Sequence, residues 1–282
     1  MNVFTEKITP ERLGRIPKRV HQDWQIASLL KNWRAVLYSK LTGKSVDTIE
    51  FRNGLILRGP PQVRLDFLFQ EVWLDEIYCP PDYKINNENI VIDIGANIGV
   101  FAAYAATCAE DVEVLAFEPF PENAGWLRRN VDENNLSNVT VYEQAVAGVT
   151  EERALEISSS WIEHSLSGTI NETGNTADKT GQILKVQCRS FDDVMNNVPK
   201  CDLLKIDCEG SEYEIFYLSS SETLSKVRRI VGEFHPRDKN TNNGKALCSF
   251  LETNGFDITH YEMFANETGI FHATNNLFCN FA

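Results

Sequence analysis

The stretch Ile90–Ile94, followed directly by the glycine turn Gly95–Gly99, constrains the fold of this chain more than any other segment. A short apolar run that passes straight into glycines predicts a buried strand that turns sharply into a helix, because glycine adopts backbone angles that other residues avoid. At such a turn a ligand can approach the free N–H groups of the helix N-terminus. The glycines are spaced G-x-x-x-G, so the dinucleotide fingerprint G-x-G-x-x-G is absent.

Strands and helices are expected to alternate from this point onward. The pattern predicts strands at 90–94, 112–117, 139–143, 203–207 and 227–234, and helices up to 108 and over 121–134, 212–218 and 244–253. Segments 256–261 and 270–273 are expected to form a closing antiparallel pair. This alternation predicts an α/β fold with a mostly parallel sheet and helices on both faces. Ligands of such sheets bind beyond the carboxyl ends of the strands.

The N-terminal region, residues 1–85, has a different pattern. Apolar residues at helical spacing predict helices over 26–41 and 65–78, and Asn53-Gly54 predicts a hairpin turn within 48–57. We expect a small helix and hairpin subdomain here that recognises the substrate or forms a dimer contact, followed by the main domain over 86–282. A homodimer is one use for its apolar surface.

Charge and composition exclude several classes of partner. The net charge of −13 repels phosphate backbones, so no nucleic-acid partner is expected. No apolar run approaches the roughly 18 residues that span a bilayer, and the N-terminus does not resemble a signal peptide, so no integral membrane segment and a cytoplasmic location are expected. The seven cysteines are widely spaced without a C-x-x-C, which argues against disulfides and zinc.

Two acidic residues frame the glycine turn. Asp93 precedes the turn, and Glu118 closes the next expected strand. Acids on two neighbouring strand tips suit a nucleoside ligand with a cationic end, such as S-adenosylmethionine, with Asp93 near its methionine part and Glu118 accepting both ribose hydroxyls. The residues expected to bind this cofactor are Asp93, Gly95, Ala96, Asn97, Gly99, Phe117, Glu118, Pro119, Ala145 and Asp207.

Further acidic residues and a histidine follow the later strands. Glu233 and His235 stand at i and i+2, so both can face one pocket. If the bound cofactor donates its methyl group to a weakly acidic hydroxyl, a general base would assist the transfer, and His235 is the first candidate. His164 is the second, because the polar loop 158–182 could act as a lid. The expected catalytic residues are His235, Asp207, Glu209, Glu233 and His164; the alternative for Asp207 and Glu209 is capping of the next helix.

The same acids could instead bind a metal ion. Asp207, Glu209, Glu233 and His235 offer ligands that an oxygen-preferring divalent ion accepts, and the ion would then acidify the acceptor hydroxyl. A divalent metal is an alternative here and not the prediction, which is a site without metal.

Several stretches together resemble the FkbM family of S-adenosylmethionine-dependent methyltransferases. The resemblance covers about 90 to 236 and lies in 91–99, 116–119, 190–194, 202–212 and 233–235. It implies the class I, Rossmann-like methyltransferase fold with a mostly parallel seven-stranded sheet, and O-methylation of a hydroxyl. Cys208 stands where valine or isoleucine is commoner in the family.

The resemblance leaves the acceptor open. We expect a sugar of a glycan or glycolipid, since the N-terminal helices and hairpin look like those of members associated with polysaccharide synthesis. The alternative acceptor is a polyketide or another small natural product. An alternative of another class is a non-catalytic cofactor-binding subunit of an assembly complex.

Overall fold

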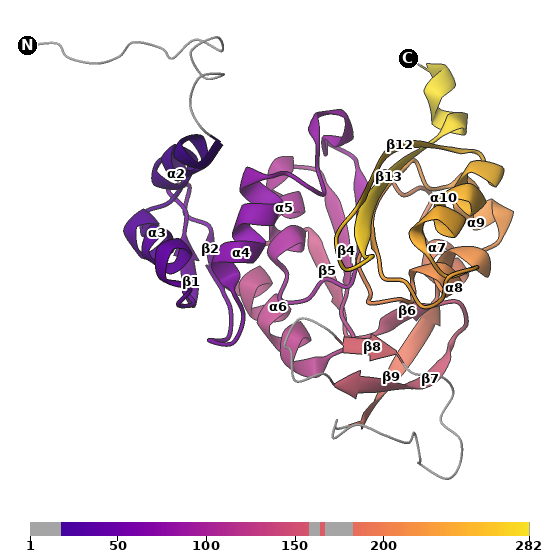
Figure 1. The fold of residues 1–282 in the computed structure, drawn as a ribbon, viewed down its shortest axis with the longest axis horizontal. Coiled ribbons are helices and arrows are strands. Elements are labelled where there is room, and N and C mark those ends of the chain that lie inside the picture. The colour runs from indigo at the N-terminus through magenta and orange to yellow at the C-terminus, as the bar shows by residue number, and fades with distance from the viewer. Residues whose placement is uncertain (1–17, 158–163, 167–182, 282) are drawn as a thin grey trace, which may run out of the picture. The chain divides into compact units, whose positions relative to one another are not determined.

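A computed structural model describes residues 18–157, 164–166 and 183–281, and its contacts divide the chain into two compact units, Met1–Asp75 and Glu76–Ala282 (Figure 1). The sequence placed this division at residue 85. Residues 76–85 belong to the second unit because they pack on its sheet: the Tyr83 hydroxyl lies 2.7 Å from Thr259 Oγ1 and 3.0 Å from Thr274 Oγ1. The role expected for the first unit stays a prediction.

The first unit contains two helices where one was expected. Helix α2 (Lys18–Leu29) and helix α3 (Trp33–Thr42) replace the single helix predicted over 26–41, which is wrong. The helix is interrupted between Leu29 and Trp33 because Asn32 hydrogen-bonds to the hairpin. The Asn32 side chain accepts the Glu50 N–H at 3.0 Å and donates to the Thr48 carbonyl at 2.8 Å.

The hairpin itself is confirmed. Strands β1 (Thr48–Glu50) and β2 (Ile56–Arg58) pair antiparallel, and Gly54 in the turn has a φ of +103°. Helix α4 (Leu65–Phe69) continues as a π-helical segment (Gln70–Leu74), so the helix predicted to reach 78 ends four residues earlier.

A seven-stranded sheet forms the centre of the second unit, in the order β12-β13-β11-β10-β3-β4-β5 (Figure 1). The five strands from β11 to β5 are parallel, and β12 and β13 complete the sheet antiparallel. This confirms the predicted class of fold. The strands are β3 (Ile90–Ile94), β4 (Glu113–Phe117), β5 (Val139–Tyr142), β10 (Leu203–Ile206), β11 (Arg229–Phe234), β12 (Phe256–Met263) and β13 (Gly269–Asn275).

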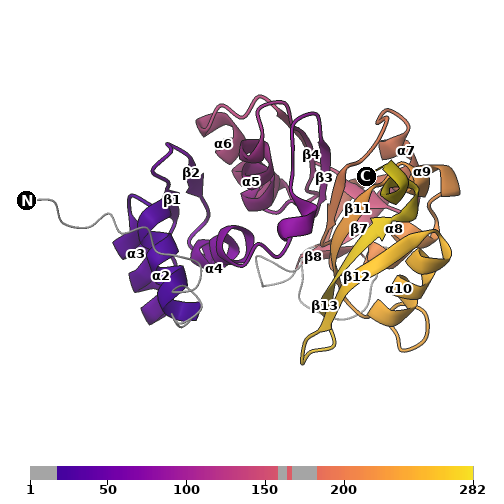
Figure 2. The same cartoon turned by 90° about the horizontal axis from the view of Figure 1, so that it is seen from above.

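Helices cover both faces of this sheet (Figures 1 and 2). Helices α5 (Val100–Cys108) and α6 (Pro121–Glu133) lie on one face, and α8 (Glu212–Tyr217) and α10 (Gly244–Thr253) lie on the other. The remaining short elements are η2 (Pro81–Tyr83), α7 (Phe191–Met195), α9 (Ser221–Ser225) and η3 (Asn276–Phe281). Polar side chains cap the N-termini of three helices: Ser190 accepts the Asp193 N–H before α7, Ser220 accepts the Thr223 N–H before α9, and Asn243 accepts the Ala246 N–H before α10.

A smaller four-stranded sheet was not predicted. It has the order β6-β9-β7-β8, with β6 at Ala145–Ala147, β7 at Glu151–Ile157, β8 at His164–Leu166 and β9 at Ile183–Ser190. Its inner side chains, among them Leu155 and Val186, are buried beside Phe120 and Ala145. The polar segment at 158–182, read as a candidate lid, lies outside the described residues except for β8.

None of the helices in the described ranges has both the length and the apolar character that a membrane crossing requires.

Candidate active site

The glycine turn lies between the carboxyl ends of β4 and β10. The N–H groups of Gly95 and Ala96 both donate to the Phe117 carbonyl at 3.0 Å. Gly95 has a φ of +77°, and a Cβ atom there would lie 1.7 Å from the Asp207 carbonyl oxygen. Only glycine therefore allows the turn to approach the end of β10 this closely.

Glu118 lines the turn from the next strand. Its Oε2 accepts the Asn97 N–H at 2.8 Å and its Oε1 accepts the Phe120 N–H at 2.9 Å. Burial raises the pKa of Glu118 to about 7, although the two N–H groups act in the opposite direction. The carboxylate is thus fixed in place, and each oxygen retains a lone pair for a ligand hydroxyl.

Asp93 is fully buried, and its charge is matched by Lys205. The two residues are direct neighbours across the parallel pair β3 and β10, so their side chains leave the same face of the sheet. Lys205 Nζ lies 3.2 Å from Asp93 Oδ1 and donates to the Gly95 carbonyl at 2.7 Å. Burial raises the pKa of Asp93, and Lys205 opposes that shift. The sequence placed Asp93 against the cofactor. Apart from the ion pair with Lys205, neither of its buried carboxylate oxygens has a hydrogen-bond partner among the described residues, and its contact with the cofactor stays a prediction.

Four carboxylates and a histidine gather beyond β10 and β11. Asp207 and Glu209 follow β10, Glu212 begins α8, and Glu233 and His235 close β11. His235 Nε2 lies 3.6 Å from Glu209 Oε2 and 4.0 Å from Asp207 Oδ1. The structure therefore brings together four of the five residues predicted to be catalytic.

His235 is held by a buried partner that the sequence reading did not select. Glu212 Oε1 lies 2.9 Å from His235 Nδ1 and also accepts the Cys208 N–H at 3.1 Å. Burial lowers the pKa of His235, but the contacts with Glu212, Asp207 and Glu209 outweigh it and raise the pKa to about 10. The imidazole is then protonated at neutral pH, a state that opposes the predicted role of general base.

Glu233 has the opposite character. Tyr78, before the sheet in sequence, donates a hydrogen bond from its hydroxyl to Glu233 Oε1 at 2.5 Å. Burial and the nearby Asp207 raise the pKa of Glu233 to about 7, while Tyr78, His235 and Lys205 lower it. A carboxylate with such a pKa can both accept and release a proton near neutral pH.

The remaining predicted site residues differ in where the structure places them: two are in the core, one is half-buried and one has no described side chain. Phe117 stacks on Tyr142 in the core, with ring centroids 4.6 Å apart, so only its carbonyl reaches the turn. Ala145 is buried in β6 beside Phe120. Pro119 is half-buried between Glu118 and Phe120. His164 lies in β8, but its side chain is outside the described part of the structure.

Three residues of the site were missed or left unassigned by sequence reasoning. Lys205 carried a signal, because a lysine inside the apolar strand Leu203–Ile206 requires a buried partner. Glu212 carried only the signal of an acid in the first turn of a helix. Tyr78 carried none, since its partner Glu233 is 155 positions away.

Asp207, Glu233 and His235 also lie close enough together to bind one metal ion. One ligand atom from each lies within 4.8 Å of the others; Glu209, the fourth residue of the metal alternative, is not in this group. In the structure Glu233 is bound by Tyr78 and His235 by Glu212. Both side chains therefore already have partners within the chain, and a metal stays the alternative to be tested.

The residues at the turn fit S-adenosylmethionine. Asn97 Oδ1 is buried without a hydrogen-bond partner among the described residues, so a ligand donor would satisfy it. The Glu118 carboxylate suits the two hydroxyls of a ribose. Carboxylates outnumber cations around the turn and the ends of β10 and β11, which favours a cationic sulfonium.

Comparisons with known proteins agree with this geometry. The family model of the methyltransferase FkbM domain matches residues 93–258. The AMB antimetabolite synthetase AmbE of Pseudomonas aeruginosa is 26% identical over 226 residues, which are 69% of this chain and 11% of AmbE, so the chain spans about a tenth of that relative. The 31-O-demethyl-FK506 methyltransferase FkbM of Streptomyces tacrolimicus is 25% identical over 240 residues, 76% of this chain and 90% of that protein. The hexuronic acid methyltransferase AglP of Haloferax volcanii is 26% identical over 154 residues, 54% of this chain and 58% of that protein.

Proposed function

The chain belongs to the FkbM family of methyltransferases, with S-adenosylmethionine as its methyl donor, and we propose that it methylates a hydroxyl on a sugar of a glycan or glycolipid. The observation that carries the proposal is the position of the acidic cluster. Asp207, Glu233 and His235 lie beyond the same strand ends as the glycine turn, so an acceptor bound there would face the cofactor.

S-adenosylmethionine, when bound, supplies a methyl group on a sulfonium sulfur, which keeps the electron pair when the carbon–sulfur bond breaks. Glu118 would accept both ribose hydroxyls, and Asn97 Oδ1 would accept a hydrogen bond from the methionine part. These contacts fix the position of the methyl carbon, which is the main requirement for an in-line displacement.

Glu233 is our candidate for the general base. It would take the proton of the acceptor hydroxyl as the new oxygen–carbon bond forms, since the residue is half-buried and the pKa of its carboxyl group is about 7. His235 would instead act as a cation that orients the acceptor or balances the charge of Asp207 and Glu209. We keep His235 in the site with this role and propose no role for His164.

A sugar acceptor is supported by the polar character of the cluster. The side chains of Asp207, Glu209 and His235 are 28%, 23% and 17% exposed, so several hydrogen-bonding groups can meet neighbouring hydroxyls of one ring. The name of AglP gives hexuronic acid as the acceptor of that relative.

A small natural product is the second candidate acceptor. The FkbM relative, named for 31-O-demethyl-FK506, is matched over 90% of its length, more than AglP. This acceptor would use the same base and the same cofactor site.

The test begins with calorimetry of S-adenosylmethionine binding to the purified protein. Transfer is then measured as release of S-adenosylhomocysteine with hexuronic-acid oligosaccharides, nucleotide sugars and hydroxylated macrolides, and mass spectrometry identifies the methylated acceptor. Glu233→Gln should slow transfer about 100-fold or more without weakening the cofactor, whereas Glu222→Gln, an exposed control, should match the wild type. Transfer only to macrolides would replace the sugar, and cofactor binding without transfer would favour the non-catalytic subunit.

A further inference from the structure

Lys205 lies between the glycine turn and the acidic residues that follow β10, and it is close to both. Its side chain is 5% exposed, and its Nζ donates to the Gly95 carbonyl at 2.7 Å and lies 3.2 Å from Asp93 Oδ1. Asp207 Oδ2 is 4.0 Å from the same nitrogen, and the Tyr78 ring centroid is 5.4 Å from it. One ammonium group thus connects the cofactor turn with the acidic cluster.

The hydrogen bond from Lys205 to the Gly95 carbonyl stabilises a turn with an unfavourable backbone conformation. Gly95 and Asn97 both have positive φ, which most residues other than glycine avoid. The N–H groups of Gly95 and Ala96 are tied to the Phe117 carbonyl, and the Asn97 N–H is tied to Glu118. Lys205 on β10 adds a hydrogen bond from the other neighbouring strand, because its ammonium group donates to the Gly95 carbonyl.

We propose that Lys205 is a positioning residue that fixes the cofactor turn Gly95–Gly99 through the Gly95 carbonyl, with Asp93 holding its ammonium in place. The inference rests on the proposed placement of S-adenosylmethionine at this turn. In this arrangement Asp93 acts on the turn through Lys205.

A simple charge effect predicts the opposite result, which makes the proposal testable. Lys205 is a cation beside the place of a cationic cofactor, so electrostatics alone would let S-adenosylmethionine bind more tightly once Lys205 is removed. S-adenosylhomocysteine lacks the sulfonium charge and would not gain in this way. A loosened turn, in contrast, weakens both ligands, because both carry the same adenosine and ribose.

The experiment uses two variants, since Lys205→Met alone leaves Asp93 buried without a counter-charge and can fail to fold. The double variant Asp93→Asn with Lys205→Met removes both charges and should fold with a melting temperature close to that of the wild type. It still lacks the donor to Gly95. We expect its dissociation constants for S-adenosylmethionine and S-adenosylhomocysteine to rise together, by about tenfold or more.

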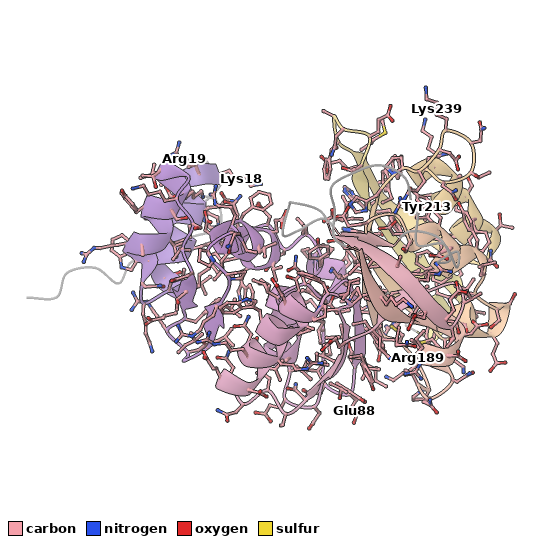
Figure 3. All side chains as sticks on the ribbon, turned by 90° about the horizontal axis from the view of Figure 1, so that it is seen from below. Lys18, Arg19, Glu88, Arg189, Tyr213 and Lys239 are labelled. Carbon is pink, nitrogen blue, oxygen red and sulfur yellow. The ribbon has the colours of Figure 1, made fainter. Side chains whose placement is uncertain are left out.

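Lys200→Met is a matched control from the other end of β10. Lys200 Nζ lies 2.9 Å from the buried Asp202 and donates to the Glu88 carbonyl at 3.2 Å, the same pair of contacts that Lys205 makes. Figure 3 shows Glu88 well away from Tyr213, which follows Glu212 in α8. This variant should bind both ligands as the wild type does.

Hydrogen exchange of the ligand-free protein gives a readout that needs no cofactor. The amides of Gly95–Gly99 should exchange faster in the double variant and unchanged in Lys200→Met. Unaltered exchange and affinity in the double variant would overturn the proposal, as would tighter S-adenosylmethionine binding with unchanged S-adenosylhomocysteine binding. If the wild type bound neither ligand, the placement of the cofactor would fail, whereas exchange at the turn would still decide the role of Lys205.

Discussion

The carboxylate of Glu212 holds the imidazole of His235, with 2.9 Å between Oε1 and Nδ1, and Glu212 has no exposed surface. The contact fixes which ring nitrogen points toward Glu209 and Asp207. It also converts a histidine that the sequence offers as a base into a stable cation. This is why we propose a carboxylate, Glu233, as the general base.

The charge of His235 can be measured directly. We expect NMR titration of its imidazole to give a pKa near 10, and Glu212→Gln to lower that pKa because the largest favourable contact is lost. Since the folded pKa lies above the unfolded value of about 6.5, the contribution to stability is complete below that pH and disappears as pH rises through 10. Glu262→Gln on β12 is the control. A His235 pKa near 6.5 in the wild type would return the residue to the list of bases.

Cofactor affinity should depend on the ionisation of Glu118. Its pKa is raised to about 7 by burial, and only the ionised carboxylate can accept hydrogen bonds from both ribose hydroxyls. Affinity for S-adenosylhomocysteine, measured by calorimetry, should therefore increase as pH rises through 7. Glu118→Gln should weaken binding and remove this dependence, whereas Glu122→Gln in the first turn of α6 should leave it intact. A flat profile in the wild type would separate Glu118 from the ligand.

The glycine at position 95 should tolerate no side chain. Gly95→Ala combines a φ of +77° with a Cβ 1.7 Å from the Asp207 carbonyl oxygen. We therefore expect the unfolding free energy to fall by about 4 kcal/mol or more. Cofactor binding should be lost as well. Gly125→Ala is the control, because no atom lies within 4 Å of its Cβ and the position is helical. That change should gain about 0.5–1 kcal/mol. Chemical denaturation measures both, and equal stability of the two variants would contradict the geometry.

The hydrogen bond from Tyr78 should stabilise the charged form of Glu233. Tyr78→Phe is expected to cost about 2 kcal/mol at pH 8, and less at pH 5.5, where Glu233 with its pKa of about 7 is neutral. Tyr83→Phe removes the hydroxyl of another buried tyrosine, which meets threonine hydroxyls, so its cost should not change with pH in this way. Denaturation curves at the two pH values provide the comparison. A pH-independent cost of Tyr78→Phe would show that Glu233 is not its ionised partner.

Metal removal should leave the protein unchanged. We expect neither a chelator nor added Mg²⁺ to shift the melting temperature or the S-adenosylmethionine affinity, because partners within the chain already bind Glu233 and His235. A shift with Mg²⁺ that Asp207→Asn abolishes would establish the metal site instead.

The sequence alone determined the strand, the turn and the acids of this site. Ile90–Ile94 is a strand as predicted, and Gly95, Asp207 and His235 all follow strand ends. These features are local: an apolar run, a glycine that permits positive φ, and polar residues at the carboxyl ends of parallel strands. The single helix over 26–41 failed because a contact across the chain, from Asn32 to the hairpin, outweighed a local pattern.

Only the tertiary structure decided which of these groups meet. Strand register places Lys205 opposite Asp93, and a shift of one residue would turn the two side chains to opposite faces. Tyr78 reaches Glu233 from 155 positions away, and Glu212 reaches His235 from 23. The protonation state of each of these side chains depends on such contacts, because burial and neighbouring groups determine its pKa. The sequence could therefore name the acids and the histidine, but not which of them is free to take a proton.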